Sequence, residues 1–259
     1  MKTFKDQDSE KHYKDKNKEF YQRINKLFTE NDIPLSSVVQ NHPCFSQRRT
    51  FPKVLANYEL FKIVQNIPGS FLELGVFLGA GLFSWSHLLE TFCPLDRSRK
   101  VFGFDHFEGY KDFSENDVDL DDYFKNNLDG DRMTSSYEIT SELVDIHEQD
   151  GVFPGVPRTE VIMGDISTTI PKFISEHAGI RFSLIYFDIN LYEPIKTSLE
   201  NLYDLLLPGG VIAFTGYSTE PWQGEAKAVN EFFEANSIQI PKMRKFPWSN
   251  LPKAYFIKT

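Results

Sequence analysis

Four acidic residues, Glu73, Asp105, Asp165 and Asp188, each come at the end of a predicted strand. The carboxyl ends of parallel strands meet at one edge of an open α/β sheet, and ligands bind beyond that edge. One such acid is usually a helix cap or a turn residue. Four acids on one edge are harder to explain as structure, so they predict a ligand site.

The first acid belongs to a glycine-rich segment at 71–81, FLELGVFLGAG. Glycine permits a tight strand-to-helix turn and the close approach of a ligand. The spacing G-x-x-x-G-x-G differs from the G-x-G-x-x-G pattern of dinucleotide-binding proteins. With an acid two residues before Gly75, the segment favours an S-adenosylmethionine pocket. A tight turn without a ligand is the alternative.

The positions of the other acids indicate separate roles. Asp105 lies 24 residues after Gly81, near the spacing at which a second-strand acid meets ribose hydroxyls. A carboxylate accepts such donors well. Asp165, after Gly164, is placed to meet an adenine amino group, and Asp188 lies where a reacting substrate would be.

The elements that must position these acids alternate between strand and helix from residue 71 onward, which predicts a doubly wound, mostly parallel seven-stranded α/β sheet of the Rossmann-like kind. The predicted strands are 71–75, 100–104, 159–163, 182–187, 211–215, 238–240 and 254–258. The predicted helices are 80–92, 136–149, 167–177, 194–206 and 224–235. Ser167 is expected to cap one helix, and Pro208-Gly209-Gly210 to end another.

Three regions follow from this pattern. Residues 1–20 are almost all polar and form a tail or the solvated start of a helix. Residues 21–68 form an N-terminal helical region, and 69–259 the ligand-binding domain. The insertion at 110–157 is too long for a structureless loop and is expected to act as a lid.

Composition excludes several classes of protein. The 259 residues are 41% hydrophobic with a net charge of −9, which disfavours a nucleic-acid partner. No apolar run approaches the roughly 18 residues that span a membrane, so no membrane partner is expected. The two cysteines form no framework, which favours a reducing, cytoplasmic location. The aromatic content of 15% and the N-terminal helices would suit a homodimer.

A series of short motifs gives a more specific indication. In order, they are ELGVxxG at 73–79, FDHFEG at 104–109, GD at 164–165, DINLYE at 188–193, LENLY at 199–203, PGG at 208–210 and GxxxAVxEF at 224–232. In this order and spacing, the segment from about 47 to 235 resembles the macrocin O-methyltransferase-like family. These are class I S-adenosylmethionine-dependent enzymes that methylate sugar hydroxyls.

The resemblance implies roles for particular residues. Glu73 and Gly75 would flank the methionine part of the cofactor, Asp105 would hold the ribose, and Asp165 would lie by the adenine. Asp188 would stand at the metal and catalytic position. The predicted cofactor site is completed by Gly79, Phe107 and Gly164.

The chain departs from the family at the metal position. The family usually has Asp-x-Asp where this chain has Asp188-Ile189-Asn190, and Asp-Asp-Tyr where it has Thr215-Gly216-Tyr217. Mg²⁺ prefers an octahedral shell of hard oxygens that includes carboxylates. One carboxylate, one amide and one hydroxyl remain, so we predict no metal-binding residues and no bound catalytic Mg²⁺.

Without a metal, a general base must remove the acceptor proton. Asp188 is the first candidate, ahead of His106 and Tyr217. The predicted function is methyl transfer to a small-molecule acceptor, a sugar or glycoside hydroxyl. Amine methylation, a non-catalytic cofactor-binding protein and a nucleotide-dependent oxidoreductase are the alternatives. The basic residues at 48–53 either close over the ligand or begin a solvated helix, and Trp222 is placed to stack on a sugar or on the cofactor.

Overall fold

The computed structural model describes residues 7–48, 50–117, 120–128 and 130–259. The chain forms two compact units, Met1–Pro52 and Lys53–Thr259. The helices of the first unit are α1 (Gln7–Asn31), α2 (Leu35–Gln40) and α3 (His42–Phe45). Within this unit the rings of Phe28 and Phe45 lie 5.4 Å apart. Helix α1 begins at Gln7, so residues 7–20 of the predicted tail are helical; residues 1–6 lie outside the described part of the chain.

The second unit is a sheet in the order β3-β2-β1-β4-β5-β6. Five strands are parallel and β6 is antiparallel to β5. The strands are β1 (Ser70–Leu74), β2 (Val101–Asp105), β3 (Thr159–Met163), β4 (Phe182–Phe187), β5 (Leu206–Phe214) and β6 (Ala254–Ile257). The chain passes from β1 outward to β3 and then returns to place β4 on the other side of β1. This reversal of strand order makes the β1–β4 junction the expected ligand-binding crevice.

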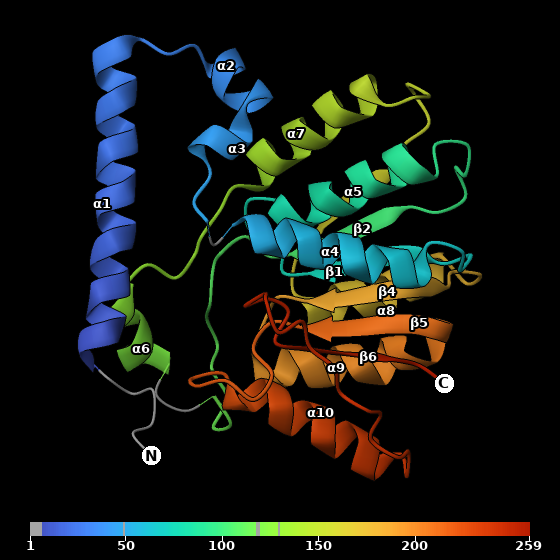
Figure 1. The fold of residues 1–259 in the computed structure, drawn as a ribbon. Coiled ribbons are helices and arrows are strands. Elements are labelled where there is room, and N and C mark those ends of the chain that lie inside the picture. Colours follow the sequence, from blue (N-terminus) through green and yellow to red (C-terminus); the bar gives the residue numbers. More distant parts are fainter. Residues whose placement is uncertain (1–6, 49, 118–119, 129) are drawn as a thin grey trace. The chain divides into compact units, whose positions relative to one another are not determined.

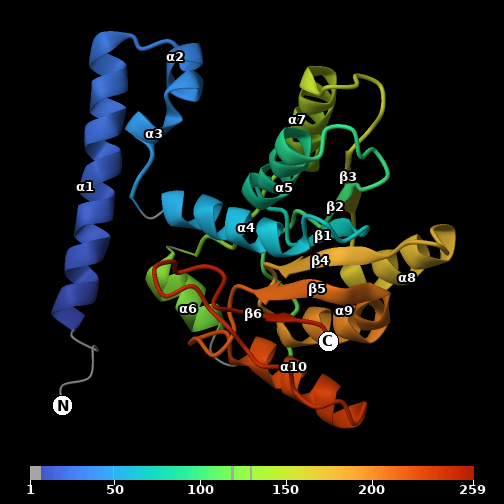
Figure 2. The same cartoon turned by 45° about the vertical axis from the view of Figure 1, so that its right-hand side comes forward.

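Helices cover both faces of the sheet (Figures 1 and 2). One face carries α4 (Phe51–Val64), α5 (Ala80–Phe92) and α7 (Tyr137–Asp150), and the other carries α8 (Ile166–Glu176), α9 (Tyr192–Leu202) and α10 (Gln223–Ala235). A short helix, α6 (Leu120–Asn127), lies in the insertion. Each face has its own apolar core, because alternate residues of a strand point to opposite sides. On β1, Leu72 and Leu74 pack in the α8–α10 core, whereas Phe71 packs in the α4–α5 core.

Helix α4 belongs with the sheet. Its Leu60, Phe61 and Val64 are fully buried in the same core as Phe71 and Trp85. Our expected boundary at 68/69 grouped this helix with the N-terminal helices, whereas the compact units divide at Pro52/Lys53. The local sequence does not show which apolar core this helix enters.

One predicted strand and one predicted helix end are wrong. The described sheet has six strands, because residues 238–240 form none; the outer side of β6 carries only an isolated bridge between Arg244 and Tyr255. Ile240 is exposed and Pro241 has no amide hydrogen to donate, so this segment is a poor strand. Residues 208–210 do not end a helix. They lie within β5, after α9 and a short 3₁₀ turn at Tyr203–Leu205.

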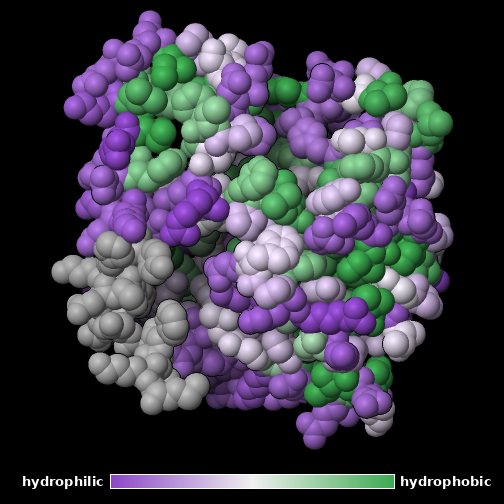
Figure 3. Space-filling model, viewed as in Figure 1, coloured by the Kyte–Doolittle hydropathy of each residue, from purple (hydrophilic) through white to green (hydrophobic). Residues whose placement is uncertain are grey.

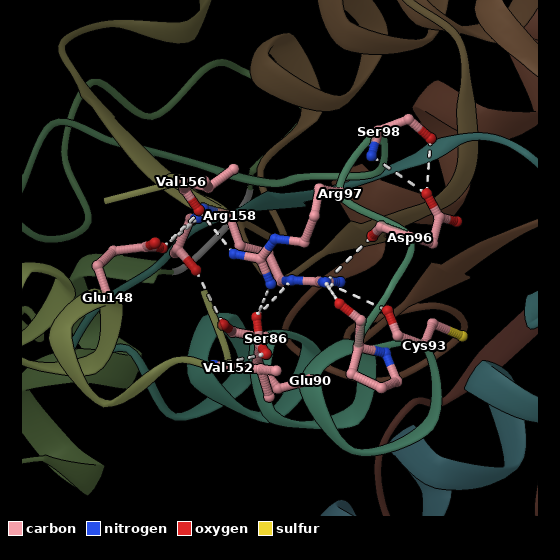
Figure 4. Close-up of polar contacts among 12 residues, drawn as sticks. Ser86, Glu90, Cys93, Asp96, Arg97, Ser98, Glu148, Val152, Val156 and Arg158 are labelled. Carbon is pink, nitrogen blue, oxygen red and sulfur yellow. Dashed lines mark hydrogen bonds and ion pairs between the residues drawn. The ribbon is translucent and has the colours of Figure 1, made fainter. Parts of the chain in front are cut away.

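Buried charges join the β3 end of the sheet to α5 and α7. We call Glu90, Arg97 and Arg158 the arginine cluster (Figure 4). Arg158 Nε lies 2.6 Å from Glu90 Oε1, and Arg97 also pairs with this oxygen. Glu148 Oε1, on α7, accepts the backbone N–H groups of Arg158 and Thr159, each at 2.8 Å. These bonds fix the end of the insertion to the start of β3.

The surface carries no extended apolar band on the face shown in Figure 3, where hydrophobic and hydrophilic residues are interspersed. Among the described residues, none of the helices combines the length and the apolar character that crossing a membrane requires. Homodimerisation stays a prediction.

Candidate active site

A cavity of about 400 Å³ opens at the carboxyl ends of the parallel strands. This volume is within the range of about 300–1,000 Å³ that is typical of small-molecule sites. All four predicted acids line it, and we call Glu73, Asp105, Asp165 and Asp188 the acidic rim. Asp112 and Glu193 add two more carboxyl groups, against two lysines, Lys53 and Lys111. The balance of charge suits a cationic ligand.

Glu73 is the most deeply buried acid of the rim. Its side chain is 1% exposed, and Trp85 Nε1 donates to its Oε2 at 2.8 Å. A Cβ on Gly81 would lie 2.1 Å from Glu73 Oε1, so the glycine at the start of α5 leaves the space that this carboxyl group occupies. Burial raises the pKa of Glu73 to about 8, although Lys53 works to lower it. A buried acid short of positive charge is a favourable place for a bound cation.

Asp105 holds the glycine-rich turn. Its Oδ2 accepts the N–H groups of Val76 and Phe77, both at 2.8 Å, and its Oδ1 accepts Phe107 N–H at 2.7 Å. The carboxylate thus fixes the loop after β1 to the loop after β2. About one of the four acceptor sites of a carboxylate remains for a ligand. Ribose binding stays a prediction, and holding the loop is a role that the sequence did not indicate.

Backbone conformations that L-residues rarely adopt gather at this edge. Phe77, Phe107 and Asn190 have φ of 52°, 63° and 56°, and each lies in the loop that follows β1, β2 or β4. Gly75 has φ of 91°, and a Cβ there would meet the carbonyl oxygen of Asp188 at 2.4 Å. Strained residues of this kind persist where the surrounding structure holds them, often at binding sites.

Asp165 is the N-cap of α8. Its side chain accepts Ser167 N–H at 2.7 Å. Hydrogen bonding from the Ser167 side chain lowers the pKa of Asp165 against the opposing effect of burial, and the Ser167 backbone N–H adds to the lowering. Our assignment of the cap to Ser167 is therefore wrong, because the carboxylate of Asp165, two residues earlier, accepts the backbone N–H of Ser167. The second carboxyl oxygen is still available in the cavity.

Asp188 is the centre of a polar network. Lys53 Nζ lies 3.1 Å from its Oδ2, and Thr215 Oγ1 lies 2.8 Å from its Oδ1. The Thr215 hydroxyl also lies 2.7 Å from Asn190 Oδ1, and Asn190 Nδ2 donates to the Tyr110 hydroxyl at 2.8 Å. A carboxylate has about four acceptor sites. Asp188 therefore retains room for a hydrogen bond from a ligand hydroxyl.

The predicted cofactor residues divide into two groups. Glu73, Gly75, Asp105, Asp165 and Asp188 all line the cavity. The described residues that line it do not include Gly79, Phe107 or Gly164. These three shape the turns: Gly79 is the N-cap of α5 with φ of 84°, and Gly164 has φ of 134°. The Phe107 ring is buried against Tyr137, with centroids 5.6 Å apart.

Several residues that line the cavity lie outside the sequence motifs. Lys53, from the basic group at 48–53, lines the cavity, and closure of this group over a ligand stays a prediction. Residues of the insertion also line the cavity, namely Tyr110, Lys111, Asp112 and Met133. Leu251, Pro194 and Thr197 line the cavity as well. Leu251 is far from every motif in the sequence, so the motifs gave no signal for it.

Three further predictions concern aromatic and basic side chains. Trp222 packs against Tyr110, with centroids 5.1 Å apart, and against Tyr123 and Phe124. It supports the cavity-lining Tyr110, and it is not among the described lining residues itself. His106 lines the cavity, and its Nδ1 accepts Glu108 N–H at 3.0 Å. Tyr217 packs on Phe214 instead.

Comparison with known proteins agrees with this geometry. The macrocin-O-methyltransferase (TylF) family matches residues 53–248. The crystal structure of CalS11, a calicheamicin methyltransferase, is 28% identical with a TM-score of 0.83, over 93% of this chain and 92% of that chain. An apo structure of CalS11, described as a TDP-rhamnose 3'-O-methyltransferase, is 28% identical with a TM-score of 0.74, over 93% and 94%. The O-methyltransferase NovP shares the fold, at 20% identity, a TM-score of 0.61 and 80% of each chain. None of the curated proteins compared matches the chain.

The chain belongs to the macrocin-O-methyltransferase family, because the family match covers most of its length. The fold and the family define it as a class I, S-adenosylmethionine-dependent methyltransferase. Both agree with the expectation from the ordered motifs.

Proposed function

We propose that this methyltransferase transfers the methyl group of S-adenosylmethionine to a hydroxyl group of a sugar, with Asp188 as general base. Support comes first from the acidic rim, which places an excess of carboxyl groups around a cavity of suitable volume. The similarity to CalS11, described as a TDP-rhamnose 3'-O-methyltransferase, supports a sugar acceptor. The single observation that carries the proposal is Asp188, which faces the cavity at the β1–β4 junction.

The residues of the rim fit the cofactor. When bound, S-adenosylmethionine supplies an electrophilic methyl group on a sulfonium centre. Glu73 offers a buried carboxyl group to the positively charged part of this ligand, and Asp105 keeps the turn above β1 in place. Asp165 retains one carboxyl oxygen for the adenine end.

The acceptor hydroxyl needs a base and a second contact. Asp188 can accept its proton as the methyl group is transferred, and such bases contribute about 10²–10⁴-fold to rates. Burial raises the pKa of Tyr110 above its usual value, so its hydroxyl stays protonated and can donate to another sugar oxygen. Holding the reactants in line supplies a further large part of the rate.

A methyl-transfer assay tests the proposal. The full chain is incubated with S-adenosylmethionine and TDP-rhamnose, and then with a panel of other nucleotide sugars and glycosides, and products are identified by mass spectrometry. We expect one methyl group to be added to a sugar oxygen, and a rate lower by about 10²–10⁴-fold with Asp188→Asn. Methylation only of amino sugars would contradict the hydroxyl acceptor, and cofactor binding without any turnover would contradict catalysis.

A further inference from the structure

The α4 lysine reaches the reaction centre. Lys53 lies in the first turn of α4, and its ammonium is 3.1 Å from Asp188 Oδ2. The two side chains are only 27% and 25% exposed, and both line the cavity. Glu73, on the neighbouring strand, is the other acid that acts on this lysine. A positive charge of the chain itself therefore contacts one carboxyl group of the acidic rim and acts electrostatically on a second.

The Lys53 side chain is charged at neutral pH. Burial works to lower the pKa of Lys53, but Asp188 and Glu73 raise it, and the net change is upward. Lys53 therefore remains an ammonium at neutral pH and serves as a charge and hydrogen-bond donor, whereas it is a poor base.

The residues around Asp188 do not fit a divalent metal. Of the three hydrogen-bonded side chains Asp188, Thr215 and Asn190, only Asp188 is a carboxylate. Thr215 and Asn190 supply a hydroxyl and an amide oxygen that are hydrogen-bonded to one another. Among the described residues, no group of three or more acidic, histidine or cysteine side chains is arranged to hold a metal. An ammonium 3.1 Å from the carboxylate would also repel Mg²⁺.

Position 216, where the family usually has the second aspartate of Asp-Asp-Tyr, has no space for a side chain. A Cβ on Gly216 would lie 2.8 Å from Trp222 Cβ and 2.9 Å from Asn190 Oδ1. An aspartate there would force the Trp222 segment or the Asn190 turn to move. The packing of Trp222 and Asn190 around this loop therefore leaves no space for an aspartate side chain at position 216.

We propose that Lys53 takes the place of the metal ion in this enzyme: its ammonium balances and positions the Asp188 carboxylate, and methyl transfer needs no divalent cation. This inference rests on the proposed function. Lys53 acts through Asp188, so it is a positioning residue. A fixed charge aimed at the reaction centre requires no reorganisation when the acceptor loses its proton.

The experiment compares four forms of the full chain after EDTA treatment: wild type, Lys53→Met, Lys53→Arg and Lys62→Met. Lys62 lies on the same helix but is exposed and paired with Glu59, so its variant is the matched control. Turnover and KM are measured with the acceptor found by the methyl-transfer assay. Binding of S-adenosylhomocysteine is measured by calorimetry, and Mn²⁺ binding by electron paramagnetic resonance.

We expect EDTA-treated wild type to keep its full activity and to bind no Mn²⁺ in the cavity. Lys53→Met should lower kcat by about 10²-fold, the effect of removing one preorganised charged donor, with S-adenosylhomocysteine affinity within about threefold of wild type. Lys53→Arg should recover most of that loss, and Lys62→Met should change nothing.

Three results would overturn the inference. The first is activity that is lost with EDTA and restored by Mg²⁺. The second is full turnover in Lys53→Met. The third is a loss in this variant that falls on S-adenosylhomocysteine affinity instead of kcat, which would make Lys53 a cofactor ligand. Since Mn²⁺ and S-adenosylhomocysteine binding need no acceptor, failure of the sugar-hydroxyl proposal would be recognised separately.

Discussion

Glu90 and Glu73 are two glutamates of the same unit with opposite surroundings. Glu90, in the arginine cluster, pairs with two guanidinium groups, and these partners lower its pKa despite the opposing effect of burial. Glu73, in the acidic rim, has a single nearby lysine and an indole N–H, and burial raises its pKa to about 8. The first carboxylate is fully balanced by the protein. The second is incompletely balanced, and it lies at the cavity.

The difference separates structural charges from functional ones. The arginine cluster joins α5 and β3, and Arg97 donates to the carbonyl oxygen of Val156. The charged groups of this cluster are therefore paired with other groups of the protein. The acidic rim has more carboxyl groups than cations, which favours a ligand that brings positive charge. Changes in the two regions should therefore affect different measurements.

The largest effect is expected at the rim. Asp188→Asn removes the base while keeping the shape of the side chain, so turnover should fall by about 10²–10⁴-fold. Cofactor affinity, measured by calorimetry, should remain within a few-fold of wild type. An Asp188→Asn enzyme with full activity would remove this residue from the mechanism.

The next largest effect is expected on stability, from a change in the arginine cluster. Arg158→Met leaves Glu90 without one of its two guanidinium partners, and breaking such a buried pair costs about 3–5 kcal/mol of stability. Chemical denaturation measures this loss. Lys172→Met, at an exposed pair on α8, is the control and should have no measurable effect. Equal stability of the two variants would show that the arginine cluster contributes little to the fold.

A smaller effect is expected at Asp105. Asp105→Ala leaves the N–H groups of Val76, Phe77 and Phe107 without their acceptor and loosens the turn above β1. Cofactor binding should weaken by about 1–3 kcal/mol, as measured by calorimetry. If the affinity is unchanged, neither the ribose contact nor the support of the loop is needed for binding.

Stability should depend on pH through Glu73. Its folded pKa, about 8, is above the ordinary value of 4.5, so between these values the folded state holds a proton that the unfolded state has lost. The Glu73 contribution is complete below about pH 4.5 and declines as the pH rises to about 8, by at most about 1.4 kcal/mol per pH unit. Glu73→Gln should remove this decline, and ligand-free denaturation curves across this range check it. A decline of the same slope in both proteins would exclude Glu73 as its source.

Much of the fold and half of the site follow from local sequence. Strands 159–163 and 182–187 and helix 80–92 match the structure residue for residue, because their apolar periods are clear and glycines or polar residues bound them. The acids at strand ends could be placed on one rim because parallel strands share an edge. The hydrogen-bond and packing partners of these side chains could not be predicted. That Asp105 would be used by backbone donors, and that Phe107 would turn toward Tyr137, depend on loops with positive φ that no local pattern specifies.

Contacts between distant segments account for the other omissions. Lys53 reaches Asp188 across 135 positions of the chain, and Leu251 comes to the cavity from beyond β5. The seventh strand was expected from two isoleucines, Ile238 and Ile240. The local sequence does not show whether a neighbouring strand would pair with this segment. Tertiary packing decided each of these points.

The most direct test of the difference between the two glutamates is the pH dependence of ligand binding. Calorimetry from pH 6 to 8 compares S-adenosylmethionine with S-adenosylhomocysteine, which lacks the sulfonium charge, in wild type and Glu73→Gln. We predict that the affinity of wild type for S-adenosylmethionine increases with pH, by up to about tenfold per unit, and more steeply than its affinity for S-adenosylhomocysteine. The variant should lose this difference. Identical, pH-independent affinities for both ligands in wild type would contradict the assignment of the acidic rim as the site of a bound cation.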